Sequence, residues 1–150
     1  MRYWTLLLCL ALACSGEPAS PEDQVRALLA ALEESAQQKD AGAMKEHVSE
    51  RYSDAQGNDK RAVAQLVAFH LLRNQSVYLL TRVQSVEIAA PGQARAQVLV
   101  AMAGTPIESP EALSLLRSDL YRFDLGLAEE HGVWRIRSAD WRPAAAGDFR

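Results

Sequence analysis

A few titratable and hydroxyl-bearing side chains of this 150-residue chain fall within apolar patterns, where burial shifts pKa values and assists proton transfer. His70 lies on the apolar side of a helical pattern and is a candidate general base. Asp140 is in strand phase with Trp134 and Ile136, so we expect it to point inward, opposite Tyr121. These two residues, His70 and Asp140, are the candidate catalytic residues of the chain.

Each candidate also has a purely structural explanation. A histidine on an apolar face commonly hydrogen-bonds a neighbouring carbonyl in the core, and a carboxylate near a strand end commonly lies at the rim of a sheet. Tyr52 and Tyr78 could donate hydrogen bonds to a ligand oxyanion, yet a tyrosine at the end of an apolar face is commonly a core residue with a solvated hydroxyl. The residue types therefore leave acid–base chemistry and structural roles both open.

Other kinds of site find no support in the sequence. His47, His70 and His131 lack the spacing of metal ligands, and the chain contains neither a nucleophile elbow nor a glycine-rich phosphate loop. Residues 129–131, Glu-Glu-His, are better explained as a solvated hairpin tip than as a cation site. The formal net charge of −3 and the absence of a basic cluster exclude nucleic acid as an expected partner. We expect no cofactor and no metal.

The first 13 residues have the features of a signal peptide. Arg2 supplies a positive start, and residues 5–13 form an apolar run too short to span a bilayer as a stable helix. The small Ala13 precedes Cys14, where a cleaving peptidase needs room. We therefore expect residues 1–13 to be removed and the mature protein to begin at Cys14.

Residues 11–14, Ala-Leu-Ala-Cys, resemble the lipobox of bacterial lipoproteins, with the large and small residues of its first two positions reversed. An ordinary secretory signal cleaved nearby is the alternative. The resemblance implies a diacylglycerol on Cys14 that anchors the protein to a membrane, and Ser15 implies sorting to the outer membrane, facing the periplasm. Cys9 is removed with the signal, which leaves the folded domain without cysteine. Residues 14–20 are the expected tether.

Residues 21–143 are expected to form one α+β domain that begins with three helices. Ser20, Pro21 and Asp23 have the types expected at the start of a helix. The apolar stripe of this first helix consists of Val25, Leu28, Leu29, Leu32 and Ala36. After a break at residues 40–42, a second helix is indicated by apolar residues at every fourth position, namely Met44, Val48 and Tyr52. A third helix, capped by Asn58 or Asp59 and ending near residue 74, carries Val63, Leu66, Val67, His70 and Leu71 on one face.

From residue 76 the apolar period changes to two, which predicts strands. Residues 77, 79, 81 and 83 share one phase, whereas Val86 and Ile88 fall on the other, so we expect a β-bulge that bends this strand. Pro91 and Gly92 form the next turn, and residues 94–103 the next strand. Residues 104–119 interrupt the sheet with a short helical turn that begins at Ser109, which we expect to cover a sheet edge.

The last hairpin shows the clearest alternation of apolar and polar residues. A four-residue loop at 129–132 would pair Leu127 with Trp134, Leu125 with Ile136 and Asp124 with Arg137. In this register apolar residues meet on one face and opposite charges on the other. Residues 144–150 are expected to form a flexible tail.

Three helices followed by a meander that ends in Gly-Val-Trp-Arg-Ile at 132–136, with Trp141 shortly after, are similar to the nuclear transport factor two-like (cystatin-like) superfamily. The resemblance implies a strongly curved, mostly antiparallel sheet of four or more strands, wrapped around the helices as a cone with a pocket. The side chains expected to line this pocket are Tyr52, His70, Tyr78, Tyr121, Phe123 and Trp134. The superfamily includes isomerases, dehydratases and non-catalytic binding domains, so the fold does not choose a function.

Three functions are consistent with these observations. The favoured one is a non-catalytic envelope lipoprotein whose domain binds a small apolar ligand or an envelope protein, because no Asp, His and Tyr grouping matches the isomerase motif. The second is a small isomerase-like or dehydratase-like enzyme that acts on a hydrophobic substrate. The third is a homodimer formed through the outer sheet face, against which the charges of Arg95, Arg122 and Arg135 argue.

Overall fold

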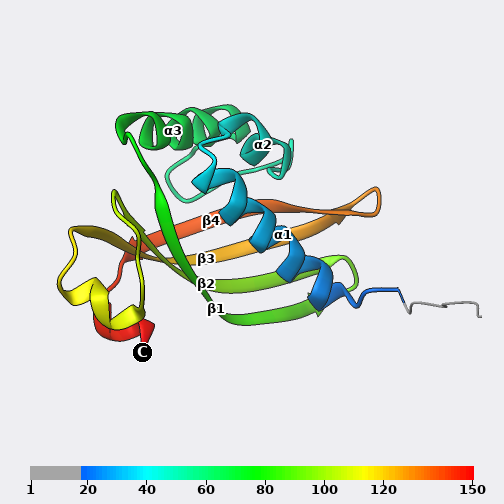
Figure 1. Ribbon diagram of the computed structural model, residues 1–150. Helices are drawn as coiled ribbons and strands as arrows, with labels where there is room; N and C mark the ends of the chain where they lie inside the picture. The colour runs from blue at the N-terminus through cyan, green and yellow to red at the C-terminus, as the bar shows by residue number, and fades with distance from the viewer. Residues whose placement is uncertain (1–17) are drawn as a thin grey trace, which may run out of the picture.

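The computed structural model describes residues 18–150. The expected signal peptide, the lipobox with Cys14 and the first part of the tether lie outside the described residues. The elements are α1 (Pro21–Gln37), α2 (Ala41–Glu46), α3 (Lys60–Arg73), β1 (Tyr78–Ala90), β2 (Gln93–Ala103), the 3₁₀ turn η1 (Pro110–Ser114), β3 (Ser118–Glu130), β4 (Val133–Pro143) and the 3₁₀ turn η2 (Ala146–Phe149). Figure 1 shows α1 lying across the curved sheet, with α2 and α3 beside its C-terminal end.

The helix starts follow local sequence signals. The Ser20 hydroxyl accepts a hydrogen bond from the Asp23 amide at 3.1 Å, which confirms the capping residue expected for α1. Asp59 caps α3 in the same way, through the Ala62 amide at 2.8 Å. These caps satisfy amides that the first turn of a helix leaves without partners.

The second helix is shorter than the apolar spacing predicted. α2 ends at Glu46, and the backbone then runs along the edge of β4, where the Ser49 amide donates to the Ile136 carbonyl at 2.9 Å. The Ile136 amide in turn donates to the His47 carbonyl at 2.9 Å, and Val48 forms a parallel bridge with Ile136. The four-residue spacing of Val48 and Tyr52 is therefore not helical. Pairing with β4 satisfies the backbone of this segment instead.

The four strands form one antiparallel meander in the order β1-β2-β3-β4. The bulge expected in β1 is confirmed, because the register between β1 and β2 shifts between Val83 and Ser85. We call inner the sheet face that packs on α1 and outer the opposite face. The inner face and the helices share one apolar cluster that includes Val25, Leu28, Val98, Leu125, Leu127, Trp134 and Ile136.

The predicted register of the last hairpin is wrong by two residues. Its turn has two residues, His131 and Gly132, both with positive φ (54° and 78°), so Glu130 pairs with Val133 and Leu127 with Ile136. A two-residue turn of this handedness matches the twist of the strands it joins. The register then shifts opposite Gly126, because Arg137 is an extra residue in β4, and beyond this bulge Asp124 pairs with Asp140.

A second, smaller core lies on the outer face. It contains Leu99, Ala101, Leu113 and Phe149, so η1 and η2 cover the face of the sheet rather than an edge. The expectation of a flexible tail at residues 144–150 is wrong. Phe149 is completely buried, its carbonyl accepts a hydrogen bond from Arg82, and the Ala144 amide donates to the Leu120 carbonyl at 2.9 Å.

Candidate functional site: an apolar cavity under the helices

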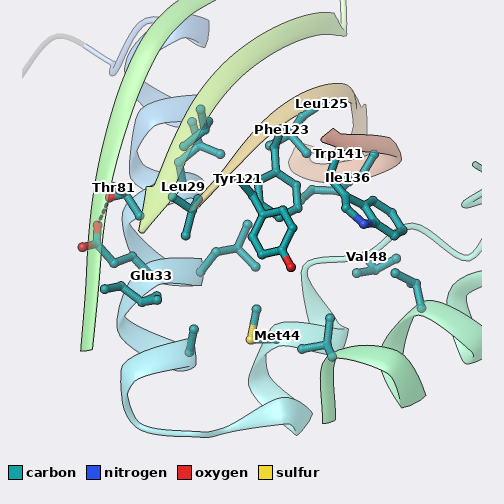
Figure 2. A pocket seen from close by; sticks show the side chains of 18 of the residues that line it. Leu29, Glu33, Met44, Val48, Thr81, Tyr121, Phe123, Leu125, Ile136 and Trp141 are labelled. Carbon is teal, nitrogen blue, oxygen red and sulfur yellow. Dashed lines mark hydrogen bonds between the residues drawn. The ribbon is translucent and has the colours of Figure 1, made fainter. Parts of the chain in front are cut away.

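A cavity of about 410 Å³ lies between the three helices and the inner face of the sheet. This volume falls within the range of pockets that hold small molecules. All three helices and all four strands contribute to its lining, for example Leu29 on α1, Met44 on α2, Val67 on α3 and Val100 on β2. The lining is largely aliphatic and aromatic, and Figure 2 shows these side chains converging on the open volume.

The aromatic side of the cavity is built by the C-terminal half of the sheet. The rings of Tyr121 and Phe123 meet edge to face, with their centroids 6.2 Å apart. The ring centroids of Phe123 and Trp141 are 6.4 Å apart. The Tyr121 hydroxyl points into the cavity in Figure 2. Among residues 18–150 this hydroxyl has no hydrogen-bond partner, so it is free to bind an oxygen of a ligand.

One carboxylate belongs to the lining. Glu33 on α1 accepts a hydrogen bond from the Thr81 hydroxyl on β1, and both side chains border the cavity (Figure 2). Among the described residues neither His70 nor Tyr121 hydrogen-bonds this carboxylate. The lining thus holds one carboxylate, whose hydrogen-bond donor among the described residues is the Thr81 hydroxyl.

The six residues expected to line a pocket separate into two groups. Tyr52, His70, Tyr121 and Phe123 are among the lining residues of the cavity. Tyr78 and Trp134 are not among its lining residues. Tyr78 is more than one-third exposed, because the alternation that turns Leu79 and Thr81 inward turns it outward. Trp134 is buried in the inner core beside the cavity.

The two candidate catalytic residues do not meet. His70 lines the cavity from α3, but it is exposed. Asp140 is exposed and absent from the lining, so the expectation that it points inward is wrong. The extra residue Arg137 reverses the phase of β4, and Ala139 and Trp141 face the cavity instead.

Tyr52 contributes its ring to the cavity but not its hydroxyl. The hydroxyl donates a 3.1 Å hydrogen bond to Asp54 in the loop before α3. Burial raises the pKa of Tyr52 far above its ordinary value, and the Asp54 charge adds to this effect. The phenol therefore stays protonated and serves to fix the loop.

Glu33 and Trp141 are lining residues that the sequence analysis missed. Glu33 follows Leu29 by four residues and precedes Ala36 by three, so helical spacing places it at the edge of the apolar stripe. Trp141 would have required recognition of the bulge at Arg137, whose sequence signal is the change of apolar phase from Trp134 and Ile136 to Ala139 and Trp141. No group of three or more histidine, cysteine, aspartate or glutamate side chains that could bind a metal occurs within residues 18–150.

Comparisons with known proteins identify the fold. No family model and no curated protein matches the sequence. Solved structures that share its fold include the following three. A candidate scytalone dehydratase from Novosphingobium aromaticivorans has a TM-score of 0.66 at 7% identity and covers 82% of this chain and 83% of its own. A nuclear transport factor two-like protein of unknown function from Silicibacter pomeroyi has a TM-score of 0.61 at 16% identity and covers 81% and 94%. A ketosteroid isomerase-like protein from Erwinia carotovora atroseptica has a TM-score of 0.62 at 10% identity and covers 83% and 96%.

The chain therefore has the nuclear transport factor two-like fold, in which helices and a curved antiparallel sheet enclose a cavity. At these identities the similarity defines the fold alone, and the similar structures include enzyme-like proteins and a protein of unknown function. No helix in the described part of the chain is both long and apolar enough to cross a membrane.

Proposed function

We propose that this chain is a lipid-anchored protein of the bacterial cell envelope whose domain binds a small apolar molecule without transforming it. The observation that carries the proposal is the cavity of about 410 Å³ with its predominantly apolar lining. Burial of apolar ligand surface there would supply most of the affinity. The inward Tyr121 hydroxyl favours a ligand that also carries one carbonyl or hydroxyl oxygen.

Native mass spectrometry of residues 15–150 purified from a bacterial periplasm tests ligand binding, because a retained molecule adds its mass to that of the protein. We expect an added mass that disappears on denaturation. The variant Val100→Phe places a ring inside the cavity and should lose the added mass. Gln97→Phe lies on the same strand, is exposed, and should keep it. A wild-type protein without added mass after exposure to envelope lipids would contradict the proposal.

The anchor is tested separately. The apolar run before Cys14 and the lipobox-like residues 11–14 support lipidation, and Ser15 supports the outer membrane. We expect the full chain to fractionate with the outer membrane and Cys14→Ser to release it into the soluble fraction or leave it with its signal uncleaved. Unchanged fractionation and processing of Cys14→Ser would contradict the lipid anchor.

An isomerase-like or dehydratase-like activity is the alternative, and Glu33 is the observation that favours it. Its carboxylate borders an apolar cavity that also receives the Tyr121 hydroxyl. A catalyst would retain a different molecule when its acid or base is removed, since substrate would then accumulate in place of product. Under our proposal Glu33→Gln retains a molecule of the same mass as the wild type does. A change in that mass would favour the enzyme.

A further inference from the structure

Helix α3 exposes three apolar side chains, of which Leu66 borders the cavity and Phe69 and Leu72 do not line it. Leu66, Phe69 and Leu72 are 37%, 59% and 75% exposed, and their three-residue spacing places them along one face of the helix. We call these three residues the α3 ridge. Neighbouring exposed apolar residues on a small domain commonly mark a surface that contacts another molecule or a membrane.

The charged residues within helix α3 itself are all basic. Helix α3 contains Lys60, Arg61 and Arg73 and no acidic residue, although the chain as a whole has a net charge of −3. The Arg73 guanidinium lies 5.5 Å from the centroid of the Phe69 ring. Lys60 pairs with Glu50 at 2.7 Å, whereas Arg61 and Arg73 have no ion-pair partner within residues 18–150. Apolar and uncompensated basic groups therefore share this surface.

The α3 ridge is continuous with the cavity. Val63, Val67 and Leu71 line the cavity from the other side of α3, and Leu66 belongs both to the lining and to the ridge. A single helix thus separates the apolar interior from the exposed apolar surface. An apolar molecule that passed around or beneath α3 would remain in contact with apolar side chains along its path.

We propose that the α3 ridge docks on the surface of an anionic phospholipid bilayer, from which the cavity takes up or returns its apolar ligand. Phe69 and Leu72 would enter the interface between headgroups and acyl chains, and Arg61 and Arg73 would pair with lipid phosphates. A second copy of the chain fits this surface less well, because two α3 helices would bring basic groups together without acidic ones. The ligand-transfer part rests on the proposed function, whereas the docking part does not.

Vesicle flotation tests the docking with a protein that begins at Ser15 and so lacks the lipid-bearing cysteine, since every described helix and strand lies after residue 20. We expect flotation with vesicles of phosphatidylethanolamine and phosphatidylglycerol, and much less with phosphatidylcholine alone. The double variant Phe69→Glu/Leu72→Glu should bind at least about tenfold more weakly, because it removes most of the inserted apolar surface. Leu115→Glu is the matched control: Leu115 is 90% exposed, lies after η1 and should bind as the wild type does.

The outcomes separate docking from ligand binding. Equal flotation of the double variant and the wild type, or no flotation of the wild type, would overturn the docking proposal. Dimerisation that the double variant abolishes, together with absent flotation, would reassign the ridge to self-association. Native mass spectrometry of the same samples reports whether ligand is bound. If the wild-type protein retains ligand but does not float, the proposed function stands and the docking proposal fails. If it floats without ligand, the docking proposal stands and the proposed function fails. Circular dichroism confirms that each variant is folded.

Discussion

Trp134 is the largest aromatic side chain packed in the inner core, and one of its atoms is left without a partner. The residue is 4% exposed and contacts the cluster that joins α1 to the sheet. Its indole Nε1 is buried and has no hydrogen-bond acceptor among the described residues. An unsatisfied buried donor costs free energy, so the ring stabilises the fold through its apolar surface and not through its nitrogen.

Replacing Trp134 with alanine should lower the free energy of unfolding by about 3–5 kcal/mol, because it removes a large buried side chain. Asp124→Ala should cost at most about 1 kcal/mol, since its 2.7 Å pair with Arg142 lies on the exposed outer face. Trp134→Phe should cost less than Trp134→Ala, as it keeps much of the apolar contact and removes the unsatisfied donor. Chemical denaturation measures all three values. Equal losses for Trp134→Ala and Asp124→Ala would show that the two faces are wrongly assigned.

His47 should make stability depend on pH. Its partial burial, followed by the nearby Arg135 charge, lowers the pKa of His47 below its ordinary value of 6.5, although Glu46 acts in the opposite direction. The unfolded chain therefore binds this proton at a higher pH than the folded chain does. The contribution of His47 is fully present above about pH 6.5 and is lost as the pH falls through the folded pKa.

The free energy of unfolding is measured at about pH 7.5 and about pH 5.5, which lie on either side of the pKa of His47 in the unfolded chain. The wild type should lose more stability over this interval than His47→Gln. Comparison of the two proteins cancels the carboxylates, which titrate identically in both. A larger loss in the variant would contradict the direction of the shift.

Among the secondary-structure elements, the short turn η2 should contribute more to the free energy of unfolding than its length suggests, because it buries Phe149. Phe149 is fully buried against Leu99, Ala101 and Leu113, and Asp148 lies 3.6 Å from Arg122. The two 3₁₀ turns thereby cover part of the outer face, which would otherwise expose apolar residues of β2 to water. The polypeptide needs this second core because the sheet carries buried apolar side chains on both faces of β2.

Phe149→Ala should destabilise the protein by about 3–5 kcal/mol, the cost typical of removing a buried phenylalanine. Arg150→Ala changes the adjacent, exposed residue and should have little effect. The difference between their denaturation midpoints measures the contribution of η2. Similar midpoints would indicate that the end of the chain is frayed, as its composition suggested.

At the scale of the whole molecule, the cavity lies on the inner side of the sheet, and the outer face combines the small core under η1 and η2 with a polar region. A second pocket, on the outer face, is lined by residues that include Ser85, Glu87, Arg95, Gln97, Asp124 and Ser138. Burying this surface in a dimer would require desolvation of several charged groups. The third function considered from the sequence, a homodimer through the outer face, is therefore disfavoured by the polarity of that face.

The lipid-free protein that begins at Ser15 should be a monomer at micromolar concentration. Light scattering after size-exclusion chromatography measures its mass. Should a dimer appear, Arg95→Glu and Phe69→Glu would distinguish assembly through the outer face from assembly through the α3 ridge, because each change affects one surface. Dissociation by Arg95→Glu but not by Phe69→Glu would support a homodimer formed through the outer face of the sheet.

The order of the elements and much of the cavity lining could be derived from the sequence, because they depend on local physics. Ser20 and Asp59 cap helices through amides three residues away, and the alternation of apolar residues in β1 and β2 selects the side chains that turn inward. The phase change after Val83 likewise revealed the bulge in β1, since it alters the pattern itself. Tyr121 and Phe123 alternate with polar residues in β3 and line the cavity, whereas Tyr52 lines it from the segment after α2 and not from the helix that its spacing predicted.

Tertiary structure decided what depends on contacts between distant segments. The bulge at Arg137 turned Trp141 inward and Asp140 outward; the apolar positions change phase between Ile136 and Ala139, but only pairing with β3 shows which residue is the extra one. Val48 is not helical, because the backbone around it hydrogen-bonds to the edge of β4. Phe149 is buried, because it packs on apolar residues on the outer face of β2. Local preferences amount to tenths of a kcal/mol per residue, whereas burial of one large side chain contributes several, so non-local packing determined these positions.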